Sequence, residues 1–408
     1  MFLFRDLFSS VNSSPFFYIR SRSLPPFGEG PDLLMAPERS LQTYLTEEGA
    51  LAREMMEWVY EPTGSFSSYL SPGCRICRMG ASLVLFVTGV CDRGCFYCPL
   101  SEERRGRDVA YANERRAESD SEIIEEARAI GALGTGITGG EPLLKMEFVI
   151  ESIGALKREF GEDHHIHLYT GARPGPSSLR DLAEAGLDEI RFHPPASEWS
   201  EPGWLYKALL DAKALGLLAG VEIPALGPAP AIVEAVRRAD AFLNLNELEF
   251  SETNQSALRA LGFRSKDYGC GAVGSDLAAE EFRVEGLRVH FCSSAFKDAV
   301  QLRERLKRRA ARTARSFDLP TEDGTLIYGV IEAVDRAGAG AVGLASAAER
   351  LKGLGVPGEM YALAEGRIEI AGWILEDIVS DLEGTGCDLA LEERYPMEGG
   401  PVMERIPL

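Results

Sequence analysis

From residue 82 onward, short apolar runs alternate with amphipathic stretches, and this alternation constrains the fold more than any other feature of the chain. Short apolar runs bounded by turn residues predict buried strands, and apolar residues at helical spacing predict helices between them. Repeated units of this kind build a parallel sheet with helices packed on it. We expect six βα units, with strands at residues 83–88, 135–138, 165–169, 189–193, 218–223 and 242–249.

The sequence after the sixth unit predicts the end of this region and a second, smaller domain. A seventh strand near 287–291 and a long helix over 297–314 close the barrel, which we place at residues 82–315. After Pro320 the pattern changes to a turn, strands near 326–331 and 367–370, and an apolar helix at 373–382. We therefore expect a small α+β domain over 316–408, and 408 residues with 45% apolar content are enough for one large and one small core.

Two segments precede the barrel. Residues 35–81 predict an N-terminal helical segment that carries a Cys-x2-Cys pair. Within residues 1–34 the opening MFLFRDLFSSVNSSPFFYIR is apolar, but Arg5 and Asp6 interrupt the apolar run and no small-residue cleavage site is evident, so a signal peptide is not indicated. A disordered arm and a start codon set too early, with Met35 as the true start, explain this segment equally well.

Three cysteines directly after the first strand are the main chemical feature. Cys91, Cys95 and Cys98 have the spacing Cys-x3-Cys-x2-Cys within CDRGCFYC. Three thiolates can hold a four-iron cluster by three of its irons and leave the fourth iron open to a small molecule. A structural zinc site is the alternative, but zinc takes four ligands and no histidine lies near the triplet. The spacing therefore favours a 4Fe-4S cluster with one open iron.

A glycine-rich TGGEP run, Thr138 to Pro142, follows the second strand. CDRGCFYC followed by TGGEP resembles the radical S-adenosylmethionine (SAM) superfamily, and the wider block LVLFVTGVCDRGCFYCPLSE resembles archaeal-type proteins related to pyruvate formate-lyase activating enzyme. The resemblance implies a partial (β/α)6 TIM-like barrel, which agrees with the six units read from the periodicity. It also implies that the open iron binds SAM and that four residues near it help to bind this cofactor: Tyr97, Gly139, Gly140 and Glu141.

The same resemblance implies a reaction. One electron, from a donor such as ferredoxin or flavodoxin, cleaves SAM to methionine and a 5'-deoxyadenosyl radical, which then takes a hydrogen atom from a substrate. The substrate is not indicated by the sequence, and modification of a small molecule, peptide or RNA is our first hypothesis. Activation of a glycyl-radical enzyme is the alternative. A non-catalytic iron-sulfur or zinc scaffold is a third hypothesis, which TGGEP disfavours because a scaffold needs no SAM-binding loop.

Polar residues lie at or near the carboxyl ends of the later strands, where parallel barrels place their working groups. Asn244 and Asn246 share one face of the sixth strand, whereas Glu247 and Glu249 share the other, so we expect only one pair to look into the barrel. A polar rim without ligand contacts is the competing interpretation for each residue. The candidates for binding SAM or the substrate are Thr170, Arg173, His193, Glu222, Asn244, Asn246, Glu247 and Glu249.

A second set of cysteines suggests a further metal site. Cys74 and Cys77 lie just before the first strand, and Cys270 and Cys292 lie near the last one. First and last strands of a barrel come close together, so these four thiols could hold a second iron-sulfur cluster or a zinc ion. The alternative is that they are buried free thiols, as is common for cysteine. Cys387 is expected to pack in the C-terminal domain.

Other polar patterns support weaker interpretations. His164, His165 and His167 could suggest a metal site, but we expect a solvated strand edge. Gly134, Gly136 and Gly139 spell G-x-G-x-x-G, yet no helix opens directly after them, which disfavours dinucleotide binding. A basic helix could contact the phosphates of RNA or of a nucleotide, although a solvated helix paired with acids is the default; its basic residues are Arg303, Arg305, Lys307, Arg308, Arg309, Arg312 and Arg315.

Composition limits the cellular setting. Eight cysteines in 408 residues are too few for a disulfide scaffold, and their clustering indicates metal binding in a reducing compartment, so we expect a cytoplasmic protein. A net charge of −20 disfavours binding of the molecule as a whole to nucleic acid or anionic membranes. No apolar run is long enough for a transmembrane helix.

Overall fold

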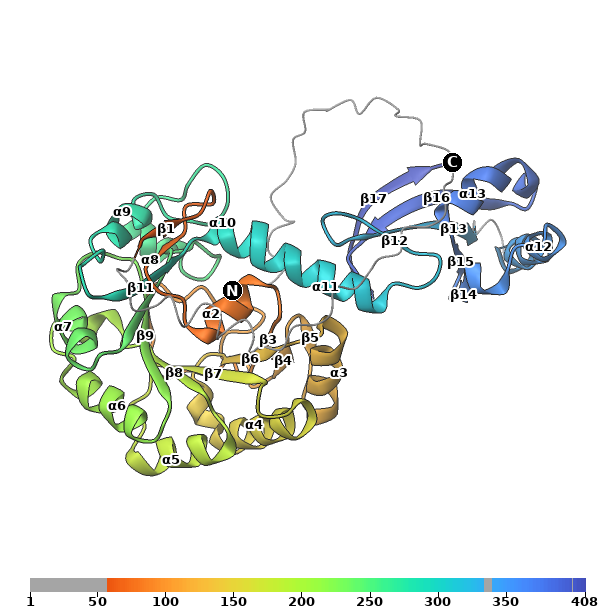
Figure 1. Cartoon of the computed structure of the whole chain (residues 1–408). Helices are drawn as coiled ribbons and strands as arrows, with labels where there is room; N and C mark the ends of the chain where they lie inside the picture. The colour runs from red at the N-terminus through yellow and green to blue at the C-terminus, as the bar shows by residue number, and fades with distance from the viewer. Residues whose placement is uncertain (1–56, 334–339, 398) are drawn as a thin grey trace.

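The computed structural model describes residues 57–333, 340–397 and 399–408. The interpretation of residues 1–34 and the first part of the expected 35–81 segment, residues 35–56, therefore lie outside the described residues. The described chain forms a curved sheet with helices around it and, after a long helix, a second and smaller sheet (Figure 1). No helix within the described ranges is long and apolar enough to cross a membrane.

A parallel sheet of seven strands forms the first region and confirms the expected βα units and the seventh strand. Along the sheet, the parallel strands have the order β11-β10-β9-β8-β7-β6-β3. Their bounds are β3 (Ser82–Phe86), β6 (Gly134–Thr138), β7 (His165–Thr170), β8 (Glu189–Phe192), β9 (Leu218–Pro224), β10 (Phe242–Asn246) and β11 (Arg288–Cys292). In this sheet β11 does not pair with β3, so the barrel is partial and open.

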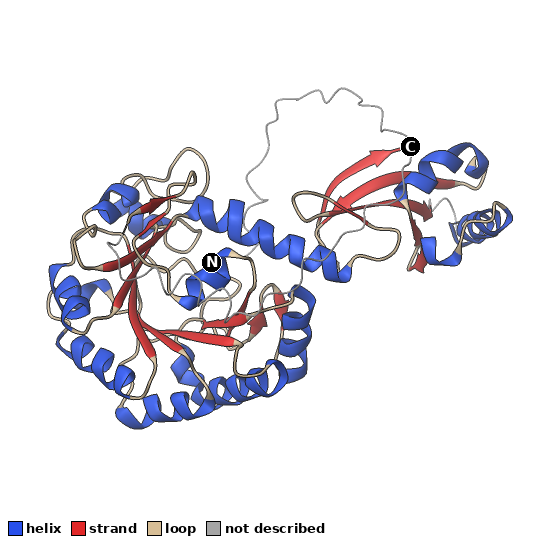
Figure 2. Cartoon of the chain, in the orientation of Figure 1, coloured by secondary structure: helices blue, strands red, loops and turns tan. Residues whose placement is uncertain are grey.

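Short antiparallel strands extend both edges of the sheet, and helices cover its outer face (Figure 2). The edge strands are β1 (Val59–Tyr60) and β2 (Phe66–Ser67) beside β11, and β4 (Tyr111–Ala112) and β5 (Arg115–Arg116) beside β3. The helices that follow successive strands are α3 (Asp120–Ile130), α4 (Met146–Phe160), α5 (Pro176–Ala185), α6 (Gly203–Ala214) and α7 (Pro230–Arg238). The capping box expected for the first of these helices is present, because Ser119 and Glu122 bond to each other's backbone amides.

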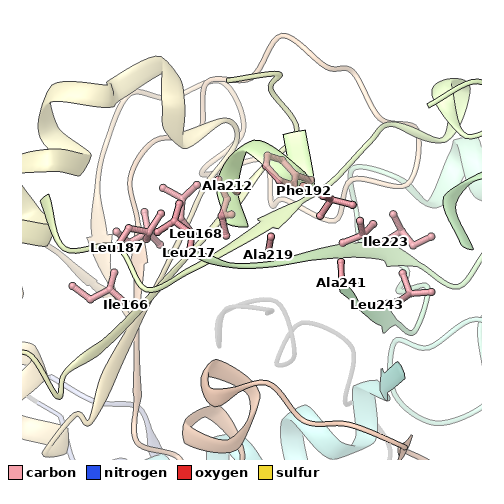
Figure 3. Packing of buried hydrophobic residues seen from close by; sticks show 14 of the residues in the cluster. Ile166, Leu168, Leu187, Phe192, Ala212, Leu217, Ala219, Ile223, Ala241 and Leu243 are labelled. Carbon is pink, nitrogen blue, oxygen red and sulfur yellow. The ribbon is translucent and has the colours of Figure 1, made fainter. Parts of the chain in front are cut away.

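The apolar core lies between the sheet and these helices (Figure 3). Alternate residues of each strand, such as Ile166 and Leu168 of β7, point into this core and are fully buried. The intervening residues face the barrel interior, and in β7 these are His165, His167 and Tyr169. The expectation that the histidines form a solvated edge is wrong, because His164, His165 and His167 are all buried.

Helix α2 (Pro72–Arg78) occupies the barrel interior, within the arc of the strands (Figure 1). A Cβ atom added to Gly73 would lie 2.6 Å from Nη2 of Arg191 and 2.8 Å from Nδ1 of His167. Only a residue without a side chain fits there, because the helix backbone packs directly on the interior of β7 and β8. The interior histidines are buried because this helix covers them.

The C-terminal region is an antiparallel sheet with helices, which agrees with the expected α+β class. Its strands have the order β14-β15-β13-β16-β17, and β12 pairs with β13. Ile331, Ile370 and Leu375 are fully buried in its small core. The elements are β12 (Leu319–Pro320), β13 (Leu326–Ala333), α12 (Gly340–Gly353), β14 (Tyr361–Ala364), β15 (Arg367–Ile370), α13 (Gly372–Ile378), β16 (Cys387–Arg394) and β17 (Val402–Pro407).

The basic helix joins the two regions. It continues from α10 (Ser294–Phe296) through a π-helical segment, Lys297–Leu302, into α11 (Arg303–Thr313). Arg305 pairs with Glu114 of the barrel, and Arg309 pairs with Glu126 of α3 and donates to the carbonyl of Pro396. Arg315 pairs with Asp318 and Glu369 of the C-terminal sheet. These pairs hold the helix between the two regions and engage three of its basic side chains with acidic partners.

Candidate functional site

A cavity of about 600 Å³ opens at the carboxyl ends of the strands. Side chains from all seven parallel strands or the loops after them line it. These include nearly every residue proposed from the sequence for cofactor binding: Cys91, Cys95, Tyr97, Cys98, Gly139, Gly140, Glu141, Thr170, His193, Asn244 and Asn246. Arg173 is the exception, because its guanidinium pairs with Glu198 at 2.8 Å and stacks over Trp204.

The cysteine triplet lies on the loop after β3, and all three thiols border the cavity. Two residues of the loop between β10 and β11 hydrogen-bond to the backbone of this segment. Asn254 donates to the carbonyl of Tyr97 at 3.1 Å, and Thr253 donates to the carbonyl of Leu100 at 2.6 Å. Sequence reasoning missed both residues because they lie about 150 positions away and belong to no local motif.

Tyr97 connects the cysteine loop to β8 and β9 through His193. The hydroxyl of Tyr97 lies 3.1 Å from Nε2 of His193, and Nδ1 of the same ring lies 2.7 Å from the carbonyl of Glu222. A carbonyl can only accept, so Nδ1 carries the proton and Nε2 accepts from the hydroxyl of Tyr97. Burial lowers the pKa of His193, which keeps the ring in this neutral form. His193 therefore positions the loop and has no ring nitrogen free for a ligand.

The glycine-rich loop after β6 packs against the cysteine loop. The amide of Gly140 donates to the carbonyl of Thr88 at 2.6 Å, and the amide of Glu141 donates to that of Val90 at 2.9 Å. A Cβ atom added to Gly140 would lie 2.4 Å from the Val90 carbonyl oxygen and 3.0 Å from the Cβ of Cys91. The two motifs are in contact, and the contact requires a glycine.

The carboxylate of Glu141 is buried, and both of its oxygens accept hydrogen bonds from other groups of the protein. It accepts from the Thr170 hydroxyl at 2.7 Å, from the amides of Gly171 and Ala172 at 2.8 and 3.0 Å, and from the amide of Leu143 at 3.0 Å. Glu141 thus ties the loop after β6 to the loop after β7. Any contact of Glu141 with a bound cofactor would therefore come from its backbone. The hydroxyl of Thr170 is likewise used within the protein, because it donates to this carboxylate.

Replacing Gly140 by alanine is expected to displace the cysteine loop. The added methyl group meets a backbone carbonyl, which cannot rotate away, and overpacking of this kind costs about 1–3 kcal/mol. The first effect should be loss of iron bound at the triplet, measured after anaerobic reconstitution. Gly175→Ala is the matched control, because no atom lies within 4 Å of its added Cβ and its φ of −74° suits alanine. Equal iron in both variants would show that the contact does not position the loop.

Glu222 organises the far side of the cavity. It accepts from Arg191 at 2.9 Å, from Asn244 at 3.1 Å and from Asn246 at 2.7 Å. Strand β10 ends at Asn246, so the next residues no longer alternate, and Glu247 and Glu249 line the cavity as well as the two asparagines. The expectation that only one of these pairs faces the interior is therefore wrong.

The four cysteines of the expected second metal site are only partly brought together. Cys74, Cys77 and Cys292 line the same cavity as the triplet, whereas Cys270 is not among its lining residues. Burial raises the pKa of the Cys292 thiol, and the nearby thiols of Cys77 and Cys74 raise it further. Cys387 lies half-buried at the start of β16. The second metal site remains a prediction.

The donor set on the cysteine loop fits an iron-sulfur cluster with one open iron. Three thiols border the cavity, and no histidine or fourth cysteine of that loop accompanies them. Burial raises the pKa of the Cys91 and Cys95 thiols, so a metal must displace their protons when it binds. Among the described residues, no three His, Cys, Asp or Glu side chains converge closely enough to bind a single ion.

Comparison with known proteins agrees with this site. The sequence profile of the "Radical SAM superfamily" matches residues 85–197, which include the cysteine and glycine-rich loops. A protein of Methanocaldococcus jannaschii named "Putative glycyl-radical enzyme activating enzyme MJ0021" is 37% identical over 359 residues, which cover 83% of this chain and 93% of the relative. The chain belongs to the radical SAM superfamily.

Other similarities are local. A GTP 3',8-cyclase of Corynebacterium glutamicum is 31% identical over 125 residues, which cover 29% of this chain and 32% of that protein. Among solved structures, SuiB of Streptococcus suis bound to S-adenosylmethionine matches with a TM-score of 0.37 and 13% identity, over 52% of this chain and 50% of that chain. Residues 324–408 match a profile described as a domain of unknown function, DUF8061.

Proposed function

We propose that this radical SAM enzyme binds a 4Fe-4S cluster through Cys91, Cys95 and Cys98 and cleaves SAM in the cavity beside them. The observation that carries the proposal is the direct contact between the cysteine loop and the glycine-rich loop at Gly140, on the wall of one large cavity. Bound together, the cluster and SAM would supply a 5'-deoxyadenosyl radical that takes a hydrogen atom from the substrate.

In this proposal, the residues of the chain bind SAM, orient it and enclose it in the cavity. Gly139, Gly140 and the backbone of Glu141 would face the amino end of SAM, next to the open iron. Tyr97 and His193 hold the cysteine loop against β8 and β9. Asn246 and Asn244 line the cavity further on, and the side-chain oxygen of Asn244 is buried without a hydrogen-bond partner. This acceptor is our candidate for contact with a donor group of SAM or of the substrate.

The substrate of the first hypothesis is a small molecule, peptide or RNA. The relative from Methanocaldococcus jannaschii favours a second candidate, the activation of a glycyl-radical enzyme, because its printed name carries that activity and it aligns with most of this chain. In either case the enzyme needs a one-electron donor, and a ferredoxin or flavodoxin is our proposal for it. A non-catalytic scaffold is the third candidate.

The test is the formation of 5'-deoxyadenosine and methionine by anaerobically reconstituted, chemically reduced protein with SAM, followed by chromatography. We expect both products in equal amounts, whereas a scaffold would give neither. Protein and small-molecule fractions of a cell extract can then be added separately. A persistent protein radical that forms only with the protein fraction would favour the activating role, and faster SAM cleavage with the small-molecule fraction would favour modification of a small molecule.

A further inference from the structure

Three thiols and one imidazole from outside the cysteine loop also line the cavity. Cys74 and Cys77 lie three residues apart on α2, so both project from the same side of this helix, and both line the cavity. His290 and Cys292 are two residues apart on β11 and point to the same face of the sheet. All four residues line the same cavity.

Asn244 shows that the helix and the strand come close together. Its side-chain amide donates to the sulfur of Cys74 at 3.3 Å. In the pairing of β10 with β11, Asn244 lies beside His290 and Asn246 lies beside Cys292. Neighbouring strands are about 4.8 Å apart, so His290 is a direct neighbour of the residue that contacts Cys74. A second, smaller cavity is also lined by both Cys74 and His290.

One buried ring nitrogen at this place has no hydrogen-bond partner among the described residues. The Nδ1 atom of His290 is inaccessible to solvent, and the residue is 93% buried. Buried polar groups are normally satisfied, so orphaned ones point to a group that binds there. An imidazole nitrogen beside three thiols is a typical ligand for a transition metal.

We propose that Cys74, Cys77 and Cys292, with His290 as the fourth ligand, hold a second iron-sulfur cluster in the barrel interior. This differs from the set expected from the sequence, because His290 replaces Cys270. Iron-sulfur clusters bind cysteine thiolates and in some centres also histidine, so this donor set suits such a cluster.

The position of this second site explains features that SAM cleavage does not use. The amide of Asn244 would donate to a cluster sulfur ligand, a contact that tunes such centres. Helix α2 is fixed by Arg191 and Glu189, which bond to Ser71 and to the amide of Gly73 at its start. The polar interior of the barrel therefore holds Cys74 and Cys77 in place, and the cluster would border the cavity where the substrate reacts.

The test uses the full chain with Cys91, Cys95 and Cys98 all changed to alanine, which removes the first cluster. After anaerobic reconstitution with iron and sulfide, this variant should retain about four irons and four sulfides per chain. Adding Cys74→Ala or Cys292→Ser should reduce the iron to less than about one per chain. Cys270→Ala and Cys387→Ala are matched controls that should keep it. Far-UV circular dichroism identifies any variant that fails to fold.

The role of His290 as the fourth ligand is tested by a separate measurement. In the same triple-alanine chain, His290→Cys should keep the cluster and lower its reduction potential, since histidine ligation raises the potential of such centres. No iron in the triple-alanine chain, iron that is unaffected by the loss of Cys74 and Cys292, or zinc bound without sulfide would each overturn the proposal. These measurements do not depend on SAM cleavage, so this proposal and the proposed function fail separately.

Discussion

Changing Cys95 to alanine should reduce 5'-deoxyadenosine formation by more than about 100-fold, since even the outer partners of metal ligands typically contribute about 10–100-fold. The thiol borders the cavity with those of Cys91 and Cys98, and a cluster with only two thiolates would not keep a single open iron in position. The product is measured by chromatography after anaerobic incubation with SAM and a chemical reductant. Substantial product from this variant would remove the triplet from the reaction.

Cys387→Ala is the matched control for this experiment. Cys387 is also partly buried and also carries a thiol, but it lies in the C-terminal sheet domain, outside the cavity. Its loss should leave 5'-deoxyadenosine formation within about twofold of the parent, because it changes the packing of that sheet by only one sulfur atom. A parallel fall in both variants would indicate general damage to the protein and not the loss of a cluster ligand.

Changing Arg191 to methionine should lower the free energy of unfolding by about 3–5 kcal/mol, the usual effect of breaking a buried ion pair. Arg191 is buried and bonds to Glu189 at 2.6 Å and to Glu222 at 2.9 Å. Methionine would leave both carboxylates without their cation. The measurement is denaturant unfolding of the parent and the variant. Lys207→Ala, which breaks only an exposed pair with Asp211, is the control and should change stability by less than about 1 kcal/mol.

The effect of Arg191→Met should also depend on pH. Burial raises the pKa of Glu189, but Arg191 and His165 outweigh burial and hold the pKa below its ordinary value in the folded protein. A carboxyl with a lowered pKa adds stability above its unfolded pKa of about 4.3, and this stability is lost as the pH falls. The difference between parent and variant should therefore stay nearly constant from pH 7 to about pH 5 and shrink as the pH falls below about 4.3. A difference that stays constant below about pH 4.3 would show that lost packing, and not lost charge, explains the variant.

The barrel strands could be predicted because their outward residues form regular apolar runs, as in Ile166 and Leu168. The cysteine and glycine-rich loops were predictable for a related reason, since each directly follows such a strand. The C-terminal helix near residue 373 was also placed within one or two residues of its observed start at Gly372. In each case the signal is local in the sequence.

The barrel interior could not be predicted, because its polarity depends on α2. A strand with His165 and His167 on one face resembles a strand with a solvated face, and only the helix packed over them makes them buried. Asn254 and His193 were likewise hidden or misread, since their contacts with the Tyr97 segment join residues about 100 to 160 positions apart. Strand β10 also ends at Asn246, so the alternation of side chains between the two faces of a strand does not extend to the glutamates that follow the asparagines.

Low-temperature EPR of reduced, anaerobically reconstituted protein, recorded with and without SAM, tests the central claim most directly. The account predicts a cluster signal that changes when SAM is added and that loses this response when Cys91, Cys95 and Cys98 are changed to alanine. The signal that remains in that variant would belong to the interior site of Cys74, Cys77 and Cys292. A parent signal that does not respond to SAM would contradict an open iron at the triplet and return the protein to the scaffold hypothesis.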